Sequence, residues 1–185
     1  STHGLKNSFD GTWPMTFWTA GAGWMAQFYD DYYLYTGDRA FLRDRALPFM
    51  KEAALFYEDF LIEGPDGRLL FSPSYSPENH PGNSDSQACI NAAMDLGVAR
   101  ELLRNCIAAL QTLGVGADDI QRWRVLLAKL PDYQIGKDGA VKEWSTPLLD
   151  DNNAHRHASH LYELFAGMPH DIATNPPLRQ AFGVA

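Results

Sequence analysis

The sequence contains few cysteines, and this argues against a disulfide-stabilised fold. Only two of its 185 residues are cysteine, Cys89 and Cys106, in a segment that we expect to be mostly helical. Their separation of 17 positions corresponds to roughly 25 Å along a helix, which is too far for a disulfide. Two unpaired thiols are typical of a reducing compartment, so they favour a cytoplasmic over an exported protein.

Long apolar runs and an excess of positive charge are also missing. No apolar stretch approaches the ~18 residues of a membrane-spanning helix. Lys and Arg total 15 against 23 Asp and Glu, which gives a net charge of −8. A negative field does not attract nucleic acid. We therefore expect neither a membrane nor nucleic acid as a partner. The length of the chain is typical of about one domain.

Aromatic residues are plentiful, at 12% of the chain with five Trp and eight Tyr. Aromatic rings can stack on flat, uncharged ligands such as sugars. A Trp-rich helical core explains the same composition, and composition alone favours that interpretation.

Apolar residues recur with the period of a helix through most of the chain. We expect an all-α fold with helices near residues 14–36, 39–62, 84–112, 117–130 and 158–166, a further helix opening after Asn175, and two short β-hairpins near 66–73 and 133–144. No linker or low-complexity tract interrupts the pattern, so residues 1–185 read as a single segment.

Individual residues mark the helix boundaries. Gly37 is expected to end the first helix and Asp38 to cap the second. Pro48 should break or kink the second helix. Gly21 and Gly23 weaken the first, and close packing or the approach of a ligand would compensate for that cost.

The stretch SPSYSPENHPGN, residues 72–83, interrupts the helical pattern with a proline-rich loop that carries one acidic residue, Glu78. Pro77 and the serines restrict the loop, so the carboxylate should be held in place. A carboxyl group whose pKa is raised by desolvation can act as a general acid near neutral pH. An exposed loop glutamate or a helix N-terminal charge explains the same spacing, and spacing alone favours these simpler interpretations.

A second polar cluster, DDNNAHRHASH, spans residues 150–160. His157, His160 and Asp150 could form a metal site, but no cysteine or second cluster supports zinc. Arg and His could instead donate to sugar hydroxyls, or the segment could be a polar cap that holds the loop and the hairpin together. Glu143 and Trp144 add an acid and an aromatic platform nearby, which favours sugar binding.

These motifs together resemble the catalytic domain of glycoside hydrolase family 95. The resemblance rests on SPSYSPEN, on ACINAAMD, on KEWSTPLLDDNNAHRHASHLYELFAG and on the stretch from WPMTFW to EDFL, and it covers Trp13 to about Gly167. The family contains inverting 1,2-α-L-fucosidases and related α-L-galactosidases. It implies an (α/α)6 toroid of twelve helices, of which this chain would supply about five.

The resemblance also implies roles for individual residues. The glutamate of the Ser-Pro-Glu-Asn loop, here Glu78, would be the general acid. Arg156 and His157 would contact the substrate, and we add His155, Trp144 and Asn79 as substrate-binding residues. The loop and the His-Arg-His segment should therefore converge, with the Glu78 carboxyl oxygens within roughly 10 Å of the Arg156 or His157 side chains. We expect an oligosaccharide substrate, no metal and no other cofactor.

Two family motifs are absent from the sequence. The family carries a His-x-Asn-x-Asn segment before the first helix and a base aspartate in a Gln-x-Asp-Gly-Asn segment further on. We therefore read the chain as the central part of a longer catalytic domain that would partner the rest of the toroid or self-associate. A non-catalytic sugar-binding or scaffold fragment, a metal-dependent hydrolase using His155, His157 and His160, and another (α/α)6 glycosidase are the alternatives.

Overall fold

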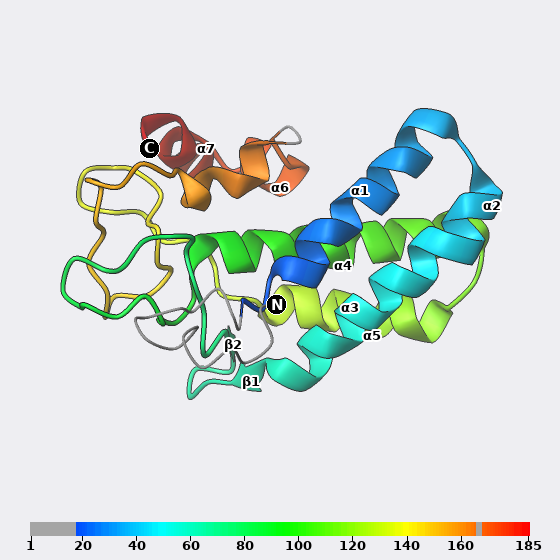
Figure 1. Cartoon of the computed structure of the whole chain (residues 1–185), viewed down its shortest axis with the longest axis horizontal. Coiled ribbons are helices and arrows are strands. Elements are labelled where there is room, and N and C mark those ends of the chain that lie inside the picture. Colours follow the sequence, from blue (N-terminus) through cyan, green and yellow to red (C-terminus); the bar gives the residue numbers. More distant parts are fainter. Residues whose placement is uncertain (1–17, 166–167) are drawn as a thin grey trace, which may run out of the picture. The chain divides into compact units, whose positions relative to one another are not determined.

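The computed structural model describes residues 18–165 and 168–185, and its class is all-α, as expected. Within these residues no helix is both long and apolar enough to cross a membrane. The elements run in the order α1 (Gly21–Thr36), α2 (Arg39–Phe41), the π-helix η3 (Leu42–Ala46), α3 (Leu47–Phe60), β1 (Ile62–Glu63), β2 (Leu69–Leu70), α4 (Ala93–Leu113), α5 (Ala117–Lys129), the 3-10 helix η4 (Ser159–Leu164), α6 (His170–Ala173) and α7 (Pro176–Val184) (Figure 1).

The described chain divides into two compact units. The helical unit comprises residues 20–70 and 98–130, and the loop unit comprises residues 18–19, 71–97 and 131–185. The division falls inside α4, between Gly97 and Val98. That residues 1–185 form one segment of a catalytic domain stays a prediction.

Local chemistry sets the first helix boundary, as the sequence predicts. Gly37 adopts a left-handed conformation with φ of 67°, and its N–H donates to the Tyr33 carbonyl at 2.8 Å. The Asp38 carboxylate then accepts the backbone N–H groups of Ala40 and Phe41, both at 2.9 Å. This pairing satisfies the exposed donors at the start of the next helix.

The break expected at Pro48 takes the form of a π-helix. Pro48 lies in the first turn of α3, directly after η3. A proline inside a helix lacks one donor and crowds the carbonyl four residues before it. The wider turns of η3 accommodate both effects, so the helical segment continues to Phe60.

Gly23 permits a close approach inside the helical unit, as expected for the glycine pair. A Cβ atom at this position would lie 2.7 Å from Val98 Cγ1 and 2.9 Å from the Tyr57 hydroxyl oxygen. A Cβ at Gly21 would meet no described atom within 4 Å, so close packing explains only one of the two glycines.

Polar contacts join α3 to α5 in the helical unit. Lys51 Nζ lies 2.6 Å from Asp119 Oδ2, and Arg122 Nε lies 2.8 Å from Glu58 Oε1. Ion pairs exposed to this degree contribute only ~0–1 kcal/mol each. The fully buried Trp123 contributes more through its apolar area, and its indole N–H also donates to Glu58.

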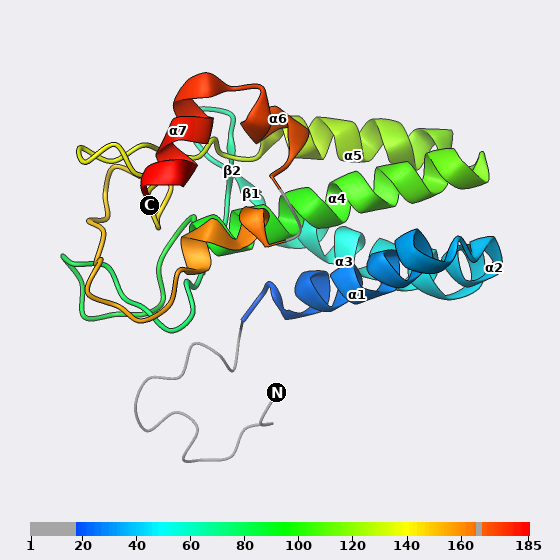
Figure 2. The ribbon, with the colours of Figure 1, turned by 90° about the horizontal axis from the view of Figure 1, so that it is seen from above.

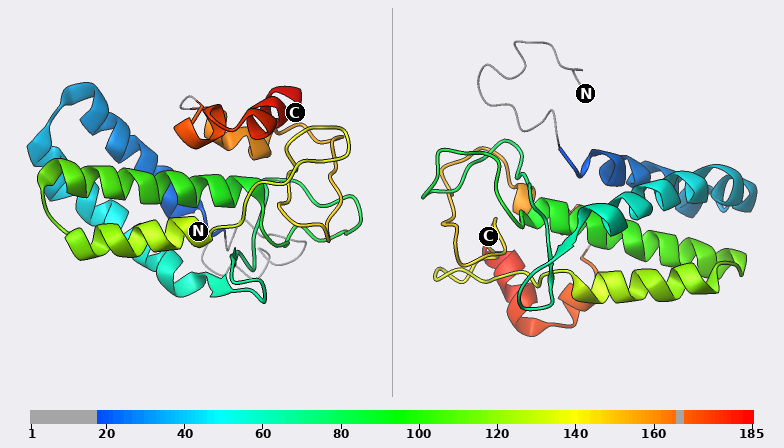
Figure 3. Two further views of the ribbon diagram at one scale, coloured as in Figure 1. Left: turned by 180° about the vertical axis from the view of Figure 1, so that it is seen from behind. Right: turned by 90° about the horizontal axis from the view of Figure 1, so that it is seen from below.

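A separate apolar cluster holds the C-terminal helices of the loop unit. Val141, Ile172, Ala181 and Phe182 are buried together, and the Tyr133 ring meets Phe182 edge to face at 5.4 Å between centroids. The Val141 N–H donates to the Ala181 carbonyl at 3.1 Å, so α7 lies beside the turn around residue 138 (Figure 3).

The expected start of the third long helix was wrong. We expected residues 84–112, but α4 begins at Ala93. The residues before it pair with distant segments instead: Cys89 bridges Ser74, and Ala92 bridges Trp144. Asn91 has a positive φ of 52°, which a helix does not allow.

Other boundaries also differ from expectation. The first hairpin is the pair β1–β2, shifted towards the N-terminus, and the second reduces to one bridge between Ile135 and Val141. The segment 158–166 forms the 3-10 helix η4 as far as Leu164, and its last expected residue lies outside the described part. We expected the first helix to start near residue 14, but α1 starts at Gly21 and residues 18–20 are not helical. Residues 14–17 lie outside the described part of the chain.

Asp30 gives a pH-dependent test of the helical unit. Its carboxyl on α1 is 8% exposed, and burial, followed by the charge of Asp31, raises its pKa to about 6. Because the folded pKa exceeds the unfolded value, the charged form costs stability above pH 6 and nothing below about pH 4. At pH 7.5, Asp30→Asn should therefore increase the free energy of unfolding by up to about 3 kcal/mol and raise the unfolding temperature. At pH 3.5 it should leave both unchanged.

Thermal unfolding of the complete protein at the two pH values measures this effect. Asp59→Asn, which changes an exposed aspartate on α3, is the matched control and should have little effect at either pH. A lower unfolding temperature for Asp30→Asn at pH 7.5 would contradict the assignment.

Candidate active site

The loop that carries Glu78 is anchored to α4 by a buried carboxylate. Asp95, with no exposed surface, accepts hydrogen bonds from the Ser74 hydroxyl at 2.6 Å, the Tyr75 N–H at 2.9 Å and the Trp18 indole N–H at 3.1 Å. Burial raises the pKa of Asp95 to about 6, although these three hydrogen bonds oppose the shift. The backbone at Tyr75 therefore has one fixed position, three residues before Glu78.

The first residues of the same loop pair with its last residues. The N–H groups and carbonyls of Ser74 and Cys89 exchange two hydrogen bonds, at 2.8 and 2.9 Å. The Asn91 side chain accepts the Phe71 N–H at 3.0 Å. Closer to the tip, the Gln87 amide donates to the Glu78 carbonyl at 3.0 Å. These contacts give an irregular segment a single closed shape.

A second buried carboxylate, Glu143, fixes the tip of the loop. Its Oε1 accepts the Ser76 hydroxyl at 2.6 Å and its Oε2 accepts the Asn79 amide at 2.7 Å. Burial raises the pKa of Glu143, and the charge of Asp151 adds to that rise, while the bonds from Ser76 and Asn79 lower it. Glu143 therefore grips the chain on both sides of Glu78.

The polar segment after residue 149 lies against the same loop (Figure 2). Asn79 and Asn152 make two hydrogen bonds: the Asn79 side-chain amide donates to the Asn152 backbone carbonyl, and the Asn152 side-chain amide donates to Asn79 Oδ1, each at 3.1 Å. The Gly82 N–H donates to the Asp150 carbonyl at 2.9 Å. For these residues the polar-cap interpretation is therefore the better one.

Further along, the segment brings three ionisable groups together. The Arg156 guanidinium donates to Glu78 Oε2, and His157 Nε2 lies 3.7 Å from the same oxygen. The Ser159 hydroxyl donates to the Pro77 carbonyl at 2.5 Å and thus holds the loop next to η4. The convergence expected from the sequence, a separation under roughly 10 Å, is confirmed.

The three groups remain accessible to a ligand. The side chains of Glu78, Arg156 and His157 are 31%, 67% and 44% exposed. Beside them the Tyr75 ring is buried, and burial, followed by the negative charge of Glu78, raises the pKa of Tyr75 to about 12. Tyr75 therefore stays protonated and uncharged next to the carboxylate.

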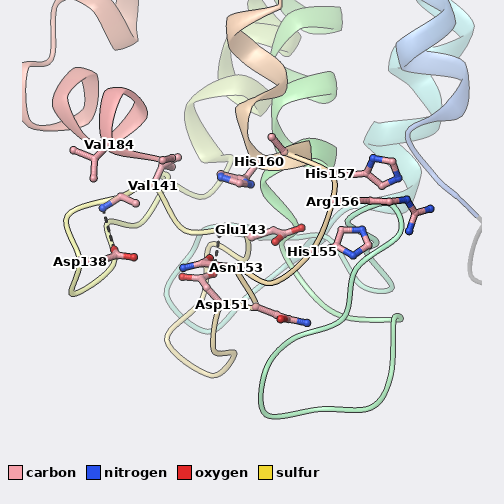
Figure 4. A pocket seen from close by; sticks show the side chains of 14 residues that line it. Asp138, Val141, Glu143, Asp151, Asn153, His155, Arg156, His157, His160 and Val184 are labelled. Carbon is pink, nitrogen blue, oxygen red and sulfur yellow. Dashed lines mark hydrogen bonds between the residues drawn. The ribbon is translucent and has the colours of Figure 1, made fainter.

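A cavity of about 450 Å³ adjoins this cluster in the loop unit (Figure 4). In the close-up, Glu143 and His160 lie near its centre, with His155, Arg156 and His157 on one side and Asp138, Val141 and Val184 on the other. Fourteen residues line it: Asp138, Ala140, Val141, Glu143, Asp151, Asn152, Asn153, His155, Arg156, His157, Ala158, His160, Val184 and Ala185.

Two histidines that line the cavity have a ring nitrogen without a hydrogen-bond partner in the described part of the chain. His155 Nε2 and His160 Nδ1 are buried atoms with no hydrogen-bond partner among the described residues. Burial lowers the pKa of both rings, and the nearby His157 and Arg156 lower that of His155 further. Neutral imidazoles can both donate to and accept from sugar hydroxyls.

The described residues form no metal centre. They contain no group of three or more His, Cys, Asp or Glu side chains placed to hold a metal ion. His155 and His157 meet edge to face with ring centroids 5.2 Å apart, and His157 points to Glu78. The three histidines of the metal alternative are therefore not arranged as a ligand set.

The structure places Trp144 and Asn79 differently from the sequence-based expectation. Trp144 has no exposed surface and its indole N–H donates to Cys89 Sγ at 3.1 Å, so it presents no platform for a sugar. Asn79 is 1% exposed and its amide is shared between Glu143 and Asn152. Both residues support the loop from inside.

Sequence reasoning gave no role to Asp95. It lies in ACINAAMD, where a lone acid follows an otherwise small and apolar run at the start of a helix. A charge within an apolar helix face is a signal of a buried hydrogen-bonded carboxylate, because an unpaired buried charge is costly.

Removing the Asp95 carboxylate should loosen the loop. Asp95→Ala leaves the buried donors of Ser74 and Tyr75 without an acceptor, which costs ~1–3 kcal/mol for each. We expect a loss of at least about 2 kcal/mol in stability and faster hydrogen exchange at the Tyr75 amide.

The control is Asp85→Ala, which removes an exposed aspartate of the same loop and should change neither quantity. Unchanged exchange at Tyr75 in the Asp95 variant would show that other contacts set the loop conformation.

A family model covers every residue of the site described above. The model of the glycosyl hydrolase family 95 catalytic domain matches residues 3–185. "Alpha-L-fucosidase 2" of Arabidopsis thaliana is 33% identical over 168 residues, 89% of this chain and 20% of its own length. "Probable alpha-fucosidase A" of Aspergillus niger is 28% identical over 158 residues, which cover 78% of this chain and 18% of that protein.

A third relative carries a different activity in its name. "1,2-alpha-glucosylglycerol phosphorylase" of Bacillus selenitireducens is 30% identical over 121 residues, 61% of this chain and 16% of that protein. The chain thus spans about a fifth of the curated relatives it matches. Because the family model covers the chain from residue 3 to its last residue, the resemblance seen in the loop and in the His-Arg-His segment is confirmed, and the chain belongs to the glycosyl hydrolase family 95 catalytic-domain family.

Proposed function

We propose that these residues are the acid-bearing part of an inverting glycoside hydrolase of α-L-fucosidase type, acting on α-linked L-fucose or L-galactose. The observation that carries the proposal is the contact of the Glu78 carboxylate with Arg156, beside His157, in a chain of this family. Two relatives named as fucosidases support the substrate class.

Two properties of Glu78, its accessibility and its fixed backbone, support the proposed role of general acid. It is partly exposed, so a glycosidic oxygen can reach it, while its backbone is held at Pro77 by Ser159 and at its own carbonyl by Gln87. A fixed acid within hydrogen-bonding reach of the leaving oxygen lowers the barrier to bond cleavage. Its Oε2 contacts Arg156, and a substrate hydroxyl that accepts the Arg156 hydrogen bond would release that oxygen.

Arg156, His157 and His155 are the proposed sugar-binding groups. Arg156 and His157 reach the Glu78 side of the segment and also line the cavity, so one sugar ring could contact both regions. The His155 Nε2 atom is buried and has no partner among the described residues, so a small shift of the ring would let a sugar hydroxyl satisfy it. A volume of about 450 Å³ falls within the range of small-molecule sites.

Inversion also requires a base that activates water on the opposite face of the sugar. The resemblance places that base in a segment that this sequence does not contain. We infer that the complete enzyme supplies it from outside these 185 residues. A non-catalytic sugar-binding fragment remains the interpretation if no such base exists.

Phosphorolysis is a second candidate because one relative is named as a phosphorylase. In an inverting phosphorylase a phosphate oxygen takes the place of the attacking water, and the general acid keeps its role. The two reactions therefore differ in the nucleophile and not in the proposed role of Glu78.

The nucleophile and the stereochemistry can be tested together. We expect the complete protein to release β-L-fucose first from an α-1,2-linked fucosyl disaccharide, at a rate independent of phosphate, when the reaction is followed by proton NMR. An α-configured first product would contradict inversion. A phosphate requirement with formation of a sugar 1-phosphate would establish phosphorolysis instead.

The acid role predicts a dependence on the leaving group. Glu78→Gln should reduce kcat/KM for a disaccharide by roughly 10²–10⁴-fold, because a sugar alcohol needs protonation to leave. A nitrophenyl α-L-fucoside should lose less than about tenfold, since its leaving group departs with little acid help.

Arg156→Ala provides the contrast. Loss of a charged hydrogen bond to the sugar, worth ~1.5–3 kcal/mol, should reduce kcat/KM for both substrates by a similar factor of roughly 10–200. Equal losses on both substrates in Glu78→Gln would remove the acid role and leave Glu78 as a loop-shaping residue.

A further inference from the structure

Glu143 occupies an unusual position for a buried acid. It is 4% exposed, and each of its carboxylate oxygens accepts one side-chain donor from the loop that carries Glu78. The donors, Ser76 and Asn79, are 0% and 1% exposed and lie on either side of Glu78 in the chain. Any movement of the Glu143 side chain would therefore shift both ends of the short segment around the proposed acid.

The same residue also contacts the segment that carries the proposed sugar-binding groups. The Glu143 N–H donates to Asp151 Oδ1 at 2.9 Å. Asn79, which Glu143 holds, pairs with Asn152 through two further hydrogen bonds. A continuous chain of contacts thus runs from the loop of Glu78 through Glu143 and Asn79 to residues 151–152, four residues before Arg156.

We propose that Glu143 is a positioning residue that sets the location of Glu78 relative to Arg156 and His157, acting through Ser76 and Asn79. This inference rests on the proposed function of Glu78. It also gives Asn79 the role of a relay inside the loop in place of the substrate contact expected from the sequence. Glu143 lines the cavity, but both of its oxygens already face protein donors.

The chemistry of the three side chains suggests a decisive pair of variants. Asn79→Asp turns the amide donor into a second carboxylate facing Glu143 Oε2, and like charges at this distance repel strongly in a buried site. Adding Glu143→Gln reverses the pair: the glutamine amide can donate to the carboxylate introduced at position 79, while the glutamine oxygen accepts the Ser76 hydroxyl. The double variant keeps the net charge and restores the contact in the opposite direction.

The experiment measures kcat/KM of the complete enzyme on a fucosyl disaccharide and on a nitrophenyl α-L-fucoside. Asn79→Asp should lose at least about 30-fold on the disaccharide and less than about threefold on the aryl substrate. The double variant, Asn79→Asp with Glu143→Gln, should recover at least about tenfold on the disaccharide. Ser76→Ala, which removes only one hydroxyl donor, should give a smaller loss with the same selectivity and serves if Asn79→Asp fails to fold.

Glu163→Gln is the matched control. Glu163 is a buried acid of the same unit that accepts the Tyr133 hydroxyl at 2.6 Å. Its variant should lose stability without preference for either substrate. A similar lack of selectivity in the Ser76 and Asn79 variants would overturn the positioning role of Glu143.

Other outcomes separate this inference from the proposed function. An Asn79→Asp variant with a raised KM on both substrates and no recovery in the double variant would show that Asn79 contacts substrate, and would overturn the inference alone. If Glu78→Gln, measured in parallel, showed no dependence on the leaving group, the acid role would fail and the positioning role with it.

Discussion

Two buried carboxylates, Asp95 and Glu143, hold the segment between β2 and α4 in one conformation. This segment forms no helix, so its backbone and side-chain donors need other acceptors. Asp95 accepts three hydrogen bonds and Glu143 accepts two from this region and from Trp18. Burial raises the pKa of both carboxyls although these hydrogen bonds act in the opposite direction, because taking a charged group out of water is unfavourable.

The polar groups of the loop unit divide by exposure into two kinds. Asp95, Glu143 and Asn79 are buried and each makes contacts with more than one partner, so none is free to exchange partners with a ligand. Glu78, Arg156 and His157 are partly exposed and contact one another. A rigid buried frame that presents a few exchangeable exposed groups is the arrangement that positioning in catalysis requires.

The sequence predicted features that depend on neighbouring residues. The cap at Gly37 and Asp38 and the positions of α1, α3 and α5 follow from local propensity and period. The convergence of the loop with the His-Arg-His segment was predicted through the family motifs. The start of α4 was not, because SDSQACIN is compatible with a helix and is held otherwise by Ser74 and Trp144, which are distant in sequence.

The burial of Trp144 could not be predicted for a related reason. Beside Glu143 in the sequence it suggests a stacking platform, but the bridge to Ala92 and the hydrogen bond to Cys89 Sγ hold its ring inside the protein. The role of Asp95 was missed because the apolar period of its helix is complete without it, and nothing local indicates its partners Ser74 and Tyr75. In each case the decisive contact joins residues far apart in the sequence.

If the site is inverting, as proposed, the residues that line the cavity limit where its catalytic base can come from. Among the described residues three carboxylates line it, and each already accepts hydrogen bonds: Glu143 from Ser76 and Asn79, Asp151 from the Glu143 N–H, and Asp138 from the Ala140 N–H at 3.0 Å. A base that activates water needs an oxygen free to accept the proton of that water. Both oxygens of Glu143 already accept a side-chain donor, whereas Asp151 and Asp138 accept these bonds through Oδ1. If Glu143 or Asp151 served as the base, it would have to give up contacts that hold the loop of Glu78 in place. The same carboxylate could not both activate water and fix the proposed acid. In the proposed mechanism, a base contributed by another segment would remove this conflict. Asp95 and Glu143 would then keep their structural contacts while Glu78 transferred the proton.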